Sequence, residues 1–320
     1  NGVGVFSSAP RGNLDKISLT TKKDNVFIGN SIALELKAYD EYNNIFNINI
    51  NDLNWSVSDD LGIVSNGVFV ANKPGVGTIT ASYNNISAST PVRVLGYPID
   101  VKKDTLNKAP EIMEGGFKIA VYNEPEISGN TLFTKIVSTS RLTSLTERLS
   151  TAALGIQMKN INDSFKNLIS HTQVVDGKSI FGTSEKESVY TINLQADSVG
   201  IRSAGSKQWV DLIDSLDTVE KKNIIITINK PVFGSAGFSD KMEADLFQDI
   251  LEKSQAKGKD IFVIQNGSSN DLEIREGIRY FTLNGGKIST PEQMSNYSFI
   301  EFTVNGEDIS YQRVYPYSLR

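Results

Sequence analysis

The sequence of 320 residues contains no cysteine and a single histidine, His171. Without cysteine the chain has no disulfide bonds, no thiolate metal sites and no cysteine nucleophile. Most transition-metal hydrolase centres use several imidazole ligands, and one histidine cannot supply them. A histidine-rich metal hydrolase is therefore excluded.

The sequence also lacks a long apolar run and an excess of positive charge. No stretch approaches the roughly 20 apolar residues that a helix needs to cross a bilayer. The formal net charge is −5, whereas a protein that binds nucleic acid or an anionic membrane needs a basic face. We therefore expect no nucleic-acid partner and no membrane span in these residues.

The length of the chain favours two domains over one hydrophobic core. Residues 1–12, "NGVGVFSSAPRG", are typical of the end of an upstream strand followed by a linker. Residues 13–97 contain several short alternating strands separated by turn residues, including a hairpin at Asn66-Gly67, and this pattern predicts an all-β sandwich. Trp55 is predicted to be a core aromatic residue of that sandwich.

Residues 13–97 resemble the bacterial Ig-like group 2 domain. The resemblance rests on "WSVS", a following "NGVF" and then "KPGVGTITASY". Domains of that family usually act as spacers or adhesive modules on exported proteins. The polar residues 98–116, which end in Gly-Gly, predict a linker after this domain.

From Phe117 onward, buried-type strands alternate with amphipathic helices. The predicted strands are "FKIAVY", "LGIQM", "SVYTINL", "NIIITIN", "DIFVIQN", "RYFTLN" and "FIEFTV", the last continuing through a hairpin at Asn305-Gly306. Ser239 is the predicted cap of a helix whose apolar stripe is Met242, Leu246, Phe247, Ile250 and Leu251. This order predicts an α/β domain over residues 117–320, a layered β-sandwich flanked by helices.

Polar stretches follow the strands of this predicted domain. They are "YNEPEIS", "KNIND", "NKPVFG" and "NGSSND", and a loop containing "FGTSEKE" precedes the strand "SVYTINL". A turn is predicted at Asn266-Gly267 in the last of the four. Functional residues of such sheets collect beyond the C-terminal ends of the strands, so these five stretches predict the site.

The order of the five stretches resembles the calcineurin-like metallophosphoesterases. In that family Asp and His residues of five motifs bind two metal ions, whose bridging hydroxide attacks a phosphoester. The motifs fall, in chain order, on Glu124-Pro125-Glu126, on Lys159-Asn160-Ile161-Asn162-Asp163, on Gly182-Thr183-Ser184-Glu185, on Asn229 before Lys230-Pro231, and on Gly267-Ser268-Ser269-Asn270. The resemblance covers about residues 117–315 and is closer in the framework than in the ligands.

Every histidine of the family pattern is replaced here, and the position of the bridging aspartate holds Asn160. A neutral Asn or Ser side chain binds Zn, Fe or Mn weakly. We therefore predict a pseudoenzyme without catalytic residues, bound metal or cofactor. Its vestigial site or ligand pocket would comprise Glu124, Glu126, Asn160, Asp163, Thr183, Ser184, Asn229, Lys230, Ser268 and Asn270.

Three alternatives remain for this domain. Glu124, Glu126 and the Asn229 carbonyl oxygen are suited to a hard ion such as Ca²⁺ or Mg²⁺, which would make the domain a divergent hydrolase. Lys159 and Lys230 place positive charge in the motif loops, where an anion such as a sugar phosphate would bind. The domain can also be an α/β fold unrelated to the phosphoesterases.

The beginning of the chain suggests its origin. It starts at Asn1 with neither Met nor a signal-peptide pattern, which predicts a piece of a longer or processed protein. Residues 1–12 resemble the final strand and exit of the phosphodiester glycosidase domain of exported bacterial proteins. That resemblance implies a secreted or cell-surface bacterial protein whose upstream glycosidase domain is a partner within the same polypeptide. A cell-envelope glycan is a second predicted partner, and an adhesin-like interaction module is a further alternative for the function.

Overall fold

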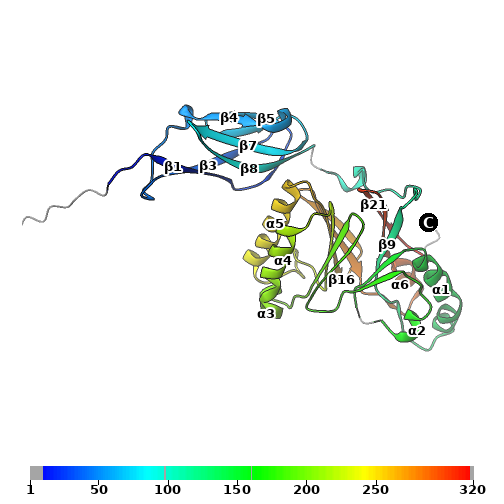
Figure 1. Ribbon diagram of the computed structural model, residues 1–320. Helices are drawn as coiled ribbons and strands as arrows, with labels where there is room; N and C mark the ends of the chain where they lie inside the picture. The colour runs from blue at the N-terminus through cyan, green and yellow to red at the C-terminus, as the bar shows by residue number, and fades with distance from the viewer. Residues whose placement is uncertain (1–9, 97–98, 160, 318–320) are drawn as a thin grey trace, which may run out of the picture. The chain divides into compact units, whose positions relative to one another are not determined.

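The computed structural model describes residues 10–96, 99–159 and 161–317, without the side chains of residues 136–142. The chain divides into two compact units. The first extends to Pro98 and includes Gln255–Gly258, and the second starts at Ile99 and contains the rest. Figure 1 shows strands in the first unit and mixed strands and helices in the second.

Two four-stranded sheets make up the first unit. The first sheet has the order β1 (Leu14–Thr21), β3 (Ser31–Asp40), β6 (Val68–Ala71), β5 (Gly62–Ser65). The second sheet has the order β2 (Asn25–Phe27), β8 (Ile86–Leu95), β7 (Gly75–Tyr83), β4 (Asn54–Val57). Phe69 from the first sheet and Ile79 and Val92 from the second are fully buried in one core, against which Trp55 packs. The β-rich prediction is thus confirmed for these residues, and the Ig-like assignment stays a prediction.

The hairpin between β5 and β6 has its turn at Asn66-Gly67, where the sequence predicts it. Ser65 pairs with Val68, which leaves Asn66 and Gly67 as a two-residue loop with positive φ angles of 50° and 74°. Asn and Gly tolerate this left-handed conformation, which a hairpin of this type requires. The predicted turn is confirmed.

Two larger sheets form the second unit. The five-stranded sheet has the order β12 (Gln173–Asp176), β11 (Leu154–Gln157), β9 (Phe117–Tyr122), β20 (Phe299–Asn305), β21 (Asp308–Val314). The six-stranded sheet has the order β13 (Phe181–Lys186), β14 (Val189–Leu194), β15 (Asn223–Ile228), β16 (Asp260–Gly267), β18 (Ile278–Asn284), β17 (Asp271–Arg275). A small parallel pair, β10 (Glu126–Ile127) and β19 (Lys287–Ile288), lies beside them.

These sheets pack face to face, with helices on both outer faces. The core between them contains Phe262 and Phe281 of one sheet and Phe302 of the other, whose rings meet edge to face at 5.2 and 6.2 Å. Residues of α4 (Lys207–Thr218) and α5 (Lys241–Ala256) share a second core with the six-stranded sheet. Residues of α1 (Leu132–Ser150), α2 (Asp163–Lys166) and α6 (Pro291–Asn296) share a third with the five-stranded sheet.

The central strands are mostly apolar because both of their faces are covered. In β15 every residue from Asn223 to Ile228 is buried. Alternate side chains of a strand point to opposite faces, so a strand between two layers needs apolar residues at consecutive positions. The continuous isoleucine run of β15 meets this need.

The segment predicted as a linker is anchored to the second unit from Asp104 onward. Arg279 donates from Nε and Nη2 to the two Asp104 carboxylate oxygens at 2.6 and 2.8 Å, and the Tyr311 hydroxyl donates to the same carboxylate. The Asp104 and Arg279 side chains are only 1% and 8% exposed. Burial by itself would raise the pKa of Asp104, but these hydrogen bonds and the Arg279 charge outweigh it and hold the pKa below its usual value.

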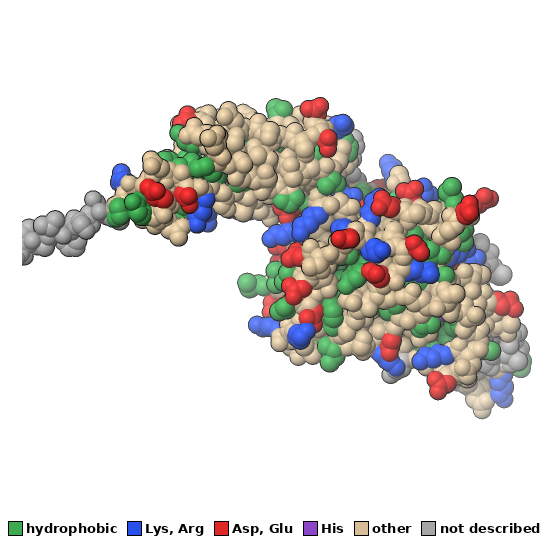
Figure 2. Space-filling view, in the orientation of Figure 1, with side chains coloured by type: hydrophobic (Ala, Val, Ile, Leu, Met, Phe, Trp, Pro, Cys, Tyr) green, Lys and Arg blue, Asp and Glu red, His purple; other side chains and the backbone are tan. Residues whose placement is uncertain are grey.

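Helix α5 differs in two details from the sequence prediction. The cap is Asp240 rather than Ser239, since the Asp240 carboxylate accepts a hydrogen bond from the Glu243 backbone N–H at 3.2 Å. Phe247 and Leu251 are buried as predicted, whereas Met242 is 83% exposed. Figure 2 shows hydrophobic side chains on the surface of this unit, between charges of both signs.

Among the described residues, no helix combines the length and apolarity that a membrane crossing requires.

Candidate functional site

The C-terminal ends of the parallel strands of both sheets meet at one edge of the second unit. Three hydrogen bonds join the two sheets there. They run from Asn123 Nδ2 to Asn266 Oδ1 at 2.7 Å, from Lys159 Nζ to the Gly285 carbonyl at 3.2 Å, and from Gln195 Nε2 to the Gly177 carbonyl at 2.8 Å. We call this region the strand-end edge. It is the place at which the five predicted polar stretches would have to come together.

Glu124 and Glu126 follow β9, and they are not equivalent. Glu124 is half-buried, and its Oε2 accepts a hydrogen bond from the backbone N–H of Asn162 at 2.7 Å. Glu126 lies in β10, where its side chain is exposed and its backbone N–H bonds to the Gly286 carbonyl. Glu124 therefore joins the β9 and β11 loops, whereas Glu126 points to solvent.

Asn160 lies outside the described residues. Asp163, from the same motif, is exposed in the first turn of α2. The cap of this helix is Asn162, whose Oδ1 accepts from the Ser164 backbone N–H at 3.2 Å. A carboxylate in the first turn stabilises a helix through its dipole, so local helix formation accounts for Asp163 without a ligand.

The "FGTSEKE" stretch is a strand and not the predicted loop. Thr183 and Ser184 lie within β13, which runs antiparallel to β14 at the edge of the six-stranded sheet. Thr183 is exposed, and the Ser184 hydroxyl accepts a hydrogen bond from Gln173 of β12. Their pairing with Ile192 and Thr191 places them along the edge strand, two and three residues from the end of β14, and not in a strand-end loop.

Asn229 and Lys230 do lie at the strand-end edge, directly after β15. The Asn229 amide forms a two-way link with Ala196, accepting from its N–H at 2.7 Å and donating to its carbonyl at 2.9 Å. Lys230 Nζ lies 3.4 Å from the Gly237 carbonyl, and its charge helps to lower the pKa of Asp197 after hydrogen bonds from Ser203, Gly200 and Val199. Both side chains connect neighbouring loops.

The last predicted motif also differs from its expected form. Strand β16 continues through Gly267, so the turn comes at Ser268 and not at Asn266-Gly267. Ser268 is exposed. Asn270 is held on both sides of its amide: its Nδ2 donates to the Asn296 carbonyl at 2.5 Å, and its Oδ1 accepts from Asn284 N–H, Ser298 Oγ and Arg313 Nη1.

This arrangement does not fit the two metal ions that the family resemblance implies. Two dications need anionic ligands between them. Instead, the amides of Asn229 and Asn270 are occupied by hydrogen bonds to the framework, and the Glu124 carboxylate accepts from a backbone N–H. Within the described ranges, no three His, Asp or Glu side chains are grouped so that they can hold a metal ion.

Sequence reasoning missed the buried amides at the centre of the edge. Asn123 and Asn266 are 1% and 6% exposed; Asn123 directly follows the strand sequence "FKIAVY", and Asn266 lies near the end of β16, after Gln265. The backbone carbonyl of Asn123 also accepts a hydrogen bond from the Tyr297 hydroxyl at 2.6 Å. An amide at the end of an apolar run was the available signal, because a buried amide needs a specific partner.

His171 belongs to a second polar cluster, on the outer side of β11. Its Nδ1 lies 2.8 Å from the Ala152 carbonyl, which can only accept, so Nδ1 carries the proton. Its Nε2 then accepts from the Tyr122 hydroxyl at 3.0 Å, and that oxygen accepts from Gln157 Nε2 at 3.2 Å. Burial raises the pKa of Tyr122 to about 12 and lowers the pKa of His171.

We expect this histidine to make the stability of the second unit depend on pH. The unfolded imidazole has its ordinary pKa near 6.5, whereas burial lowers the folded value. The unfolded chain therefore binds more protons as the pH falls through about 6.5, and the free energy of unfolding decreases. The slope is limited to about 1.4 kcal/mol per pH unit and is reduced because the ring is partly exposed to solvent.

Urea unfolding between pH 7.5 and 5.5 measures this slope. Because His171 is the only histidine in the chain, His171→Gln should remove it. Hydrogen bonds hold the pKa of the Asp104 and Asp197 carboxyls below its usual range, so these groups act only in more acidic solution. An unchanged slope in His171→Gln would show that the histidine is not buried in its neutral form.

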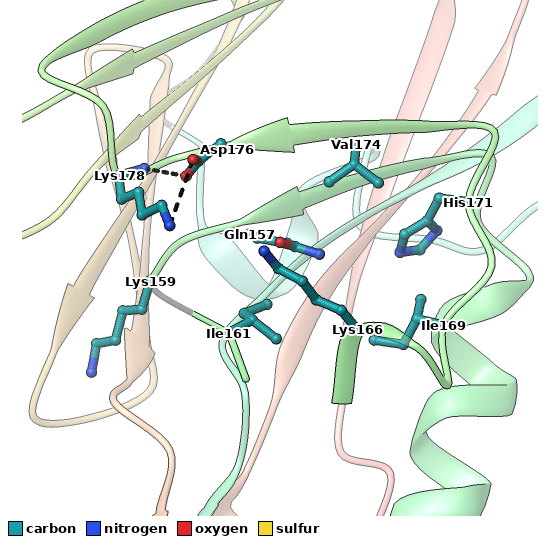
Figure 3. Close-up of a pocket in the computed structure, with 9 residues that line it drawn as sticks. All are labelled: Gln157, Lys159, Ile161, Lys166, Ile169, His171, Val174, Asp176 and Lys178. Carbon is teal, nitrogen blue, oxygen red and sulfur yellow. Dashed lines mark hydrogen bonds and ion pairs between the residues drawn. The ribbon is translucent and has the colours of Figure 1, made fainter. Parts of the chain in front are cut away.

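A pocket of about 220 Å³ opens beside this cluster, at the ends of β11 and β12. It is lined by Gln157, Lys159, Ile161, Lys166, Ile169, His171, Val174, Asp176 and Lys178. Figure 3 shows these side chains. Lys159 and Ile161 belong to one of the five predicted motifs, whereas α2, which carries Lys166, was not predicted.

No known protein-family profile and no curated protein sequence matches this chain. Among solved structures, domains 4 and 5 of the S-layer protein SbsC are 21% identical over 27% of this chain and 54% of that one, with a TM-score of 0.24. The chain thus spans about half the length of that S-layer fragment.

Two further structures match a longer part of the chain. Vps29 from Entamoeba histolytica, complexed with Zn²⁺, is 11% identical over 62% of this chain and 98% of its own, with a TM-score of 0.30. A hypothetical protein from Thermus thermophilus is 10% identical over the same shares, with a TM-score of 0.34. Likenesses at this level say nothing of the ligands or activity of this chain.

Proposed function

We propose that residues 117–320 form a non-catalytic module with the framework of a calcineurin-like phosphoesterase. The observation that supports this most is the use of the motif side chains as structural links. Asn229 bonds both halves of its amide to Ala196, and Asn270 bonds to four groups of its surroundings. A side chain whose donors and acceptors are already satisfied gains little by turning to a metal ion.

The module belongs, in this proposal, to an exported bacterial protein of the cell envelope. Residues 13–97 act as an Ig-like spacer, and the two units position an upstream domain of the phosphodiester glycosidase type. The sequence resemblances of residues 1–12 and 13–97 support this assignment. A phosphorylated glycan of the envelope is the ligand that such an accessory region would bind.

Hydrolysis of bis(p-nitrophenyl) phosphate tests the proposal. With Mn²⁺, Ni²⁺, Zn²⁺, Fe²⁺ or Ca²⁺ added in turn, the full chain should release p-nitrophenol no faster than a protein-free blank. An active phosphodiesterase serves as the positive control for each metal solution. Metal-dependent turnover that Glu124→Ala abolishes would contradict the proposal and identify the chain as a divergent hydrolase that uses oxygen ligands.

A further inference from the structure

The pocket beside His171 has the composition of an anion site. We call it the lysine pocket. Three of its nine lining residues are lysines, and the one acidic residue is Asp176, so the formal charge is +2 with the histidine neutral. This balance is opposite to that of the whole chain, whose net charge is −5. A locally positive cavity on an acidic protein favours a negatively charged ligand.

The three ammonium groups are used differently. Lys159 donates to the Gly285 carbonyl, and Figure 3 shows its side chain pointing away from the other lining residues. Lys178 Nζ lies 3.8 Å from Asp176 Oδ2, beyond hydrogen-bond distance, so its donors are not all committed. Lys166, at the end of α2, extends towards Gln157, and its ammonium forms no hydrogen bond or ion pair with the described residues.

Gln157 gives the pocket a polar floor of known orientation. It is 7% exposed, and its Nε2 is committed to the Tyr122 hydroxyl, whose own proton goes to His171. The network fixes the amide so that its carbonyl oxygen is the acceptor left for a ligand. A hydroxyl group is the matching donor.

The remaining wall is apolar and small. Ile161, Ile169 and Val174 line it, and the apolar side chain of Val174 is 53% exposed to solvent. The volume of about 220 Å³ is below the roughly 300–1,000 Å³ of pockets that enclose drug-sized ligands. The pocket therefore accepts one head group with a few carbon atoms, and not a long oligosaccharide.

We propose that the lysine pocket binds a phosphomonoester on a sugar or polyol. Lys166 and Lys178 would donate to the phosphate oxygens, and Gln157 Oε1 would accept a hydrogen bond from a neighbouring hydroxyl. Charge-assisted hydrogen bonds from two ammonium groups suit a dianionic phosphate. This inference deepens the proposed function, because it gives the non-catalytic module a ligand class and a location.

Isothermal titration calorimetry of the full chain with glucose 6-phosphate tests the site. Saturable binding to one site is expected, and Lys166→Ala and Lys178→Ala should each weaken it about tenfold or more. Lys207→Ala is the control, since it removes an exposed lysine of α4 that does not line the pocket, and its affinity should stay within about twofold. Absence of saturable binding, or an equal loss in Lys207→Ala, would overturn the proposal.

Separate titrations with inorganic phosphate and with glucose measure how much the phosphate contacts and the hydroxyl contact each contribute to the affinity. Phosphate alone should bind more weakly than glucose 6-phosphate but with the same dependence on Lys166, and glucose alone should not bind measurably. Equal affinity for phosphate and glucose 6-phosphate would overturn the hydroxyl contact at Gln157.

The two proposals fail differently. Hydrolysis of bis(p-nitrophenyl) phosphate would contradict the non-catalytic role whatever the calorimetry shows, whereas missing binding without hydrolysis would remove only the lysine pocket.

Discussion

Replacing Asp104 with alanine is expected to lower the free energy of unfolding of the second unit by about 3–5 kcal/mol. The carboxylate of Asp104 holds two nitrogens of Arg279, and both side chains are almost fully buried. Without Asp104, the Arg279 guanidinium remains inside the protein with no countercharge, and the Tyr311 hydroxyl loses its acceptor. Most of the effect comes from this uncompensated charge.

Urea unfolding followed by Trp209 fluorescence measures the loss. The chain has two tryptophans, and Trp55 lies in the first unit, so a Trp55→Phe background leaves Trp209 to report on the second. In that background Asp211→Ala is the control, because it removes an ion pair with Lys207 whose lysine is 82% exposed. It should cost no more than about 0.5 kcal/mol.

A combined variant separates the loss of the Asp104–Arg279 ion pair from the effect of leaving the Arg279 charge buried and unpaired. Asp104→Leu with Arg279→Met and Tyr311→Phe removes all three polar groups together. Because apolar replacement of a whole buried ion pair is often nearly neutral, the triple variant should be more stable than Asp104→Ala alone. A triple variant that is less stable would mean that the ion pair itself, and not the unpaired arginine, dominates.

Gly155→Ala is expected to destabilise the second unit by about 2–4 kcal/mol. Gly155 lies in the buried strand β11, and a Cβ there would come within 2.3 Å of the His171 ring atoms Cδ2 and Nε2. The ring cannot move aside freely, since it is bonded to the Ala152 carbonyl on one side and to the Tyr122 hydroxyl on the other. The methyl group therefore adds strain and breaks hydrogen bonds.

The same tryptophan-based assay measures the free energy of unfolding of this variant. A second substitution, His171→Ala, tests whether the added methyl group clashes with the imidazole. In the double variant the space left by the imidazole accepts the new methyl group. The cost of Gly155→Ala measured in the His171→Ala background should therefore be much smaller than in the parent, a coupling expected of residues in contact. Equal costs in both backgrounds would show that the clash is not with His171.

The central strands could be predicted from the sequence because a strand covered on both faces is apolar along its length. β9, β11, β14, β15 and β16 are rich in buried apolar residues, with a few polar residues among them, and were found. β13 was predicted as a loop because "FGTSEK" is polar and partly exposed at a sheet edge. Its strand form depends on pairing with β14, which local sequence does not encode.

Helix α5 shows a similar limit. The 3.6-residue period correctly placed Phe247 and Leu251 in the core, but it also included Met242 and Leu246, which are 83% and 47% exposed. Periodicity tells which residues share a broad face of a helix. How much of that face is covered depends on the width of the sheet and on the neighbouring helix.

The candidate site was only partly predictable. The rule that polar residues gather at strand ends located Glu124, Asn229 and Lys230 at the strand-end edge. Cross-sheet partners such as Asn123 and Asn266 come from strands that are far apart in the sequence, and their contact is set by the packing of two sheets. Lys166 lies at the end of a helix of four residues, too short for a periodic signal.

The central claim of the proposed function is that framework hydrogen bonds, and not metal ions, occupy the motif side chains at the strand-end edge. A crystal soaked with Mn²⁺ and phosphate, with data collected at the Mn absorption edge, tests it most directly. The account predicts no anomalous peak among Glu124, Asn229 and Asn270, with phosphate density between Lys166 and Lys178. Two anomalous peaks about 4 Å apart between Glu124 and Asn229 would contradict it.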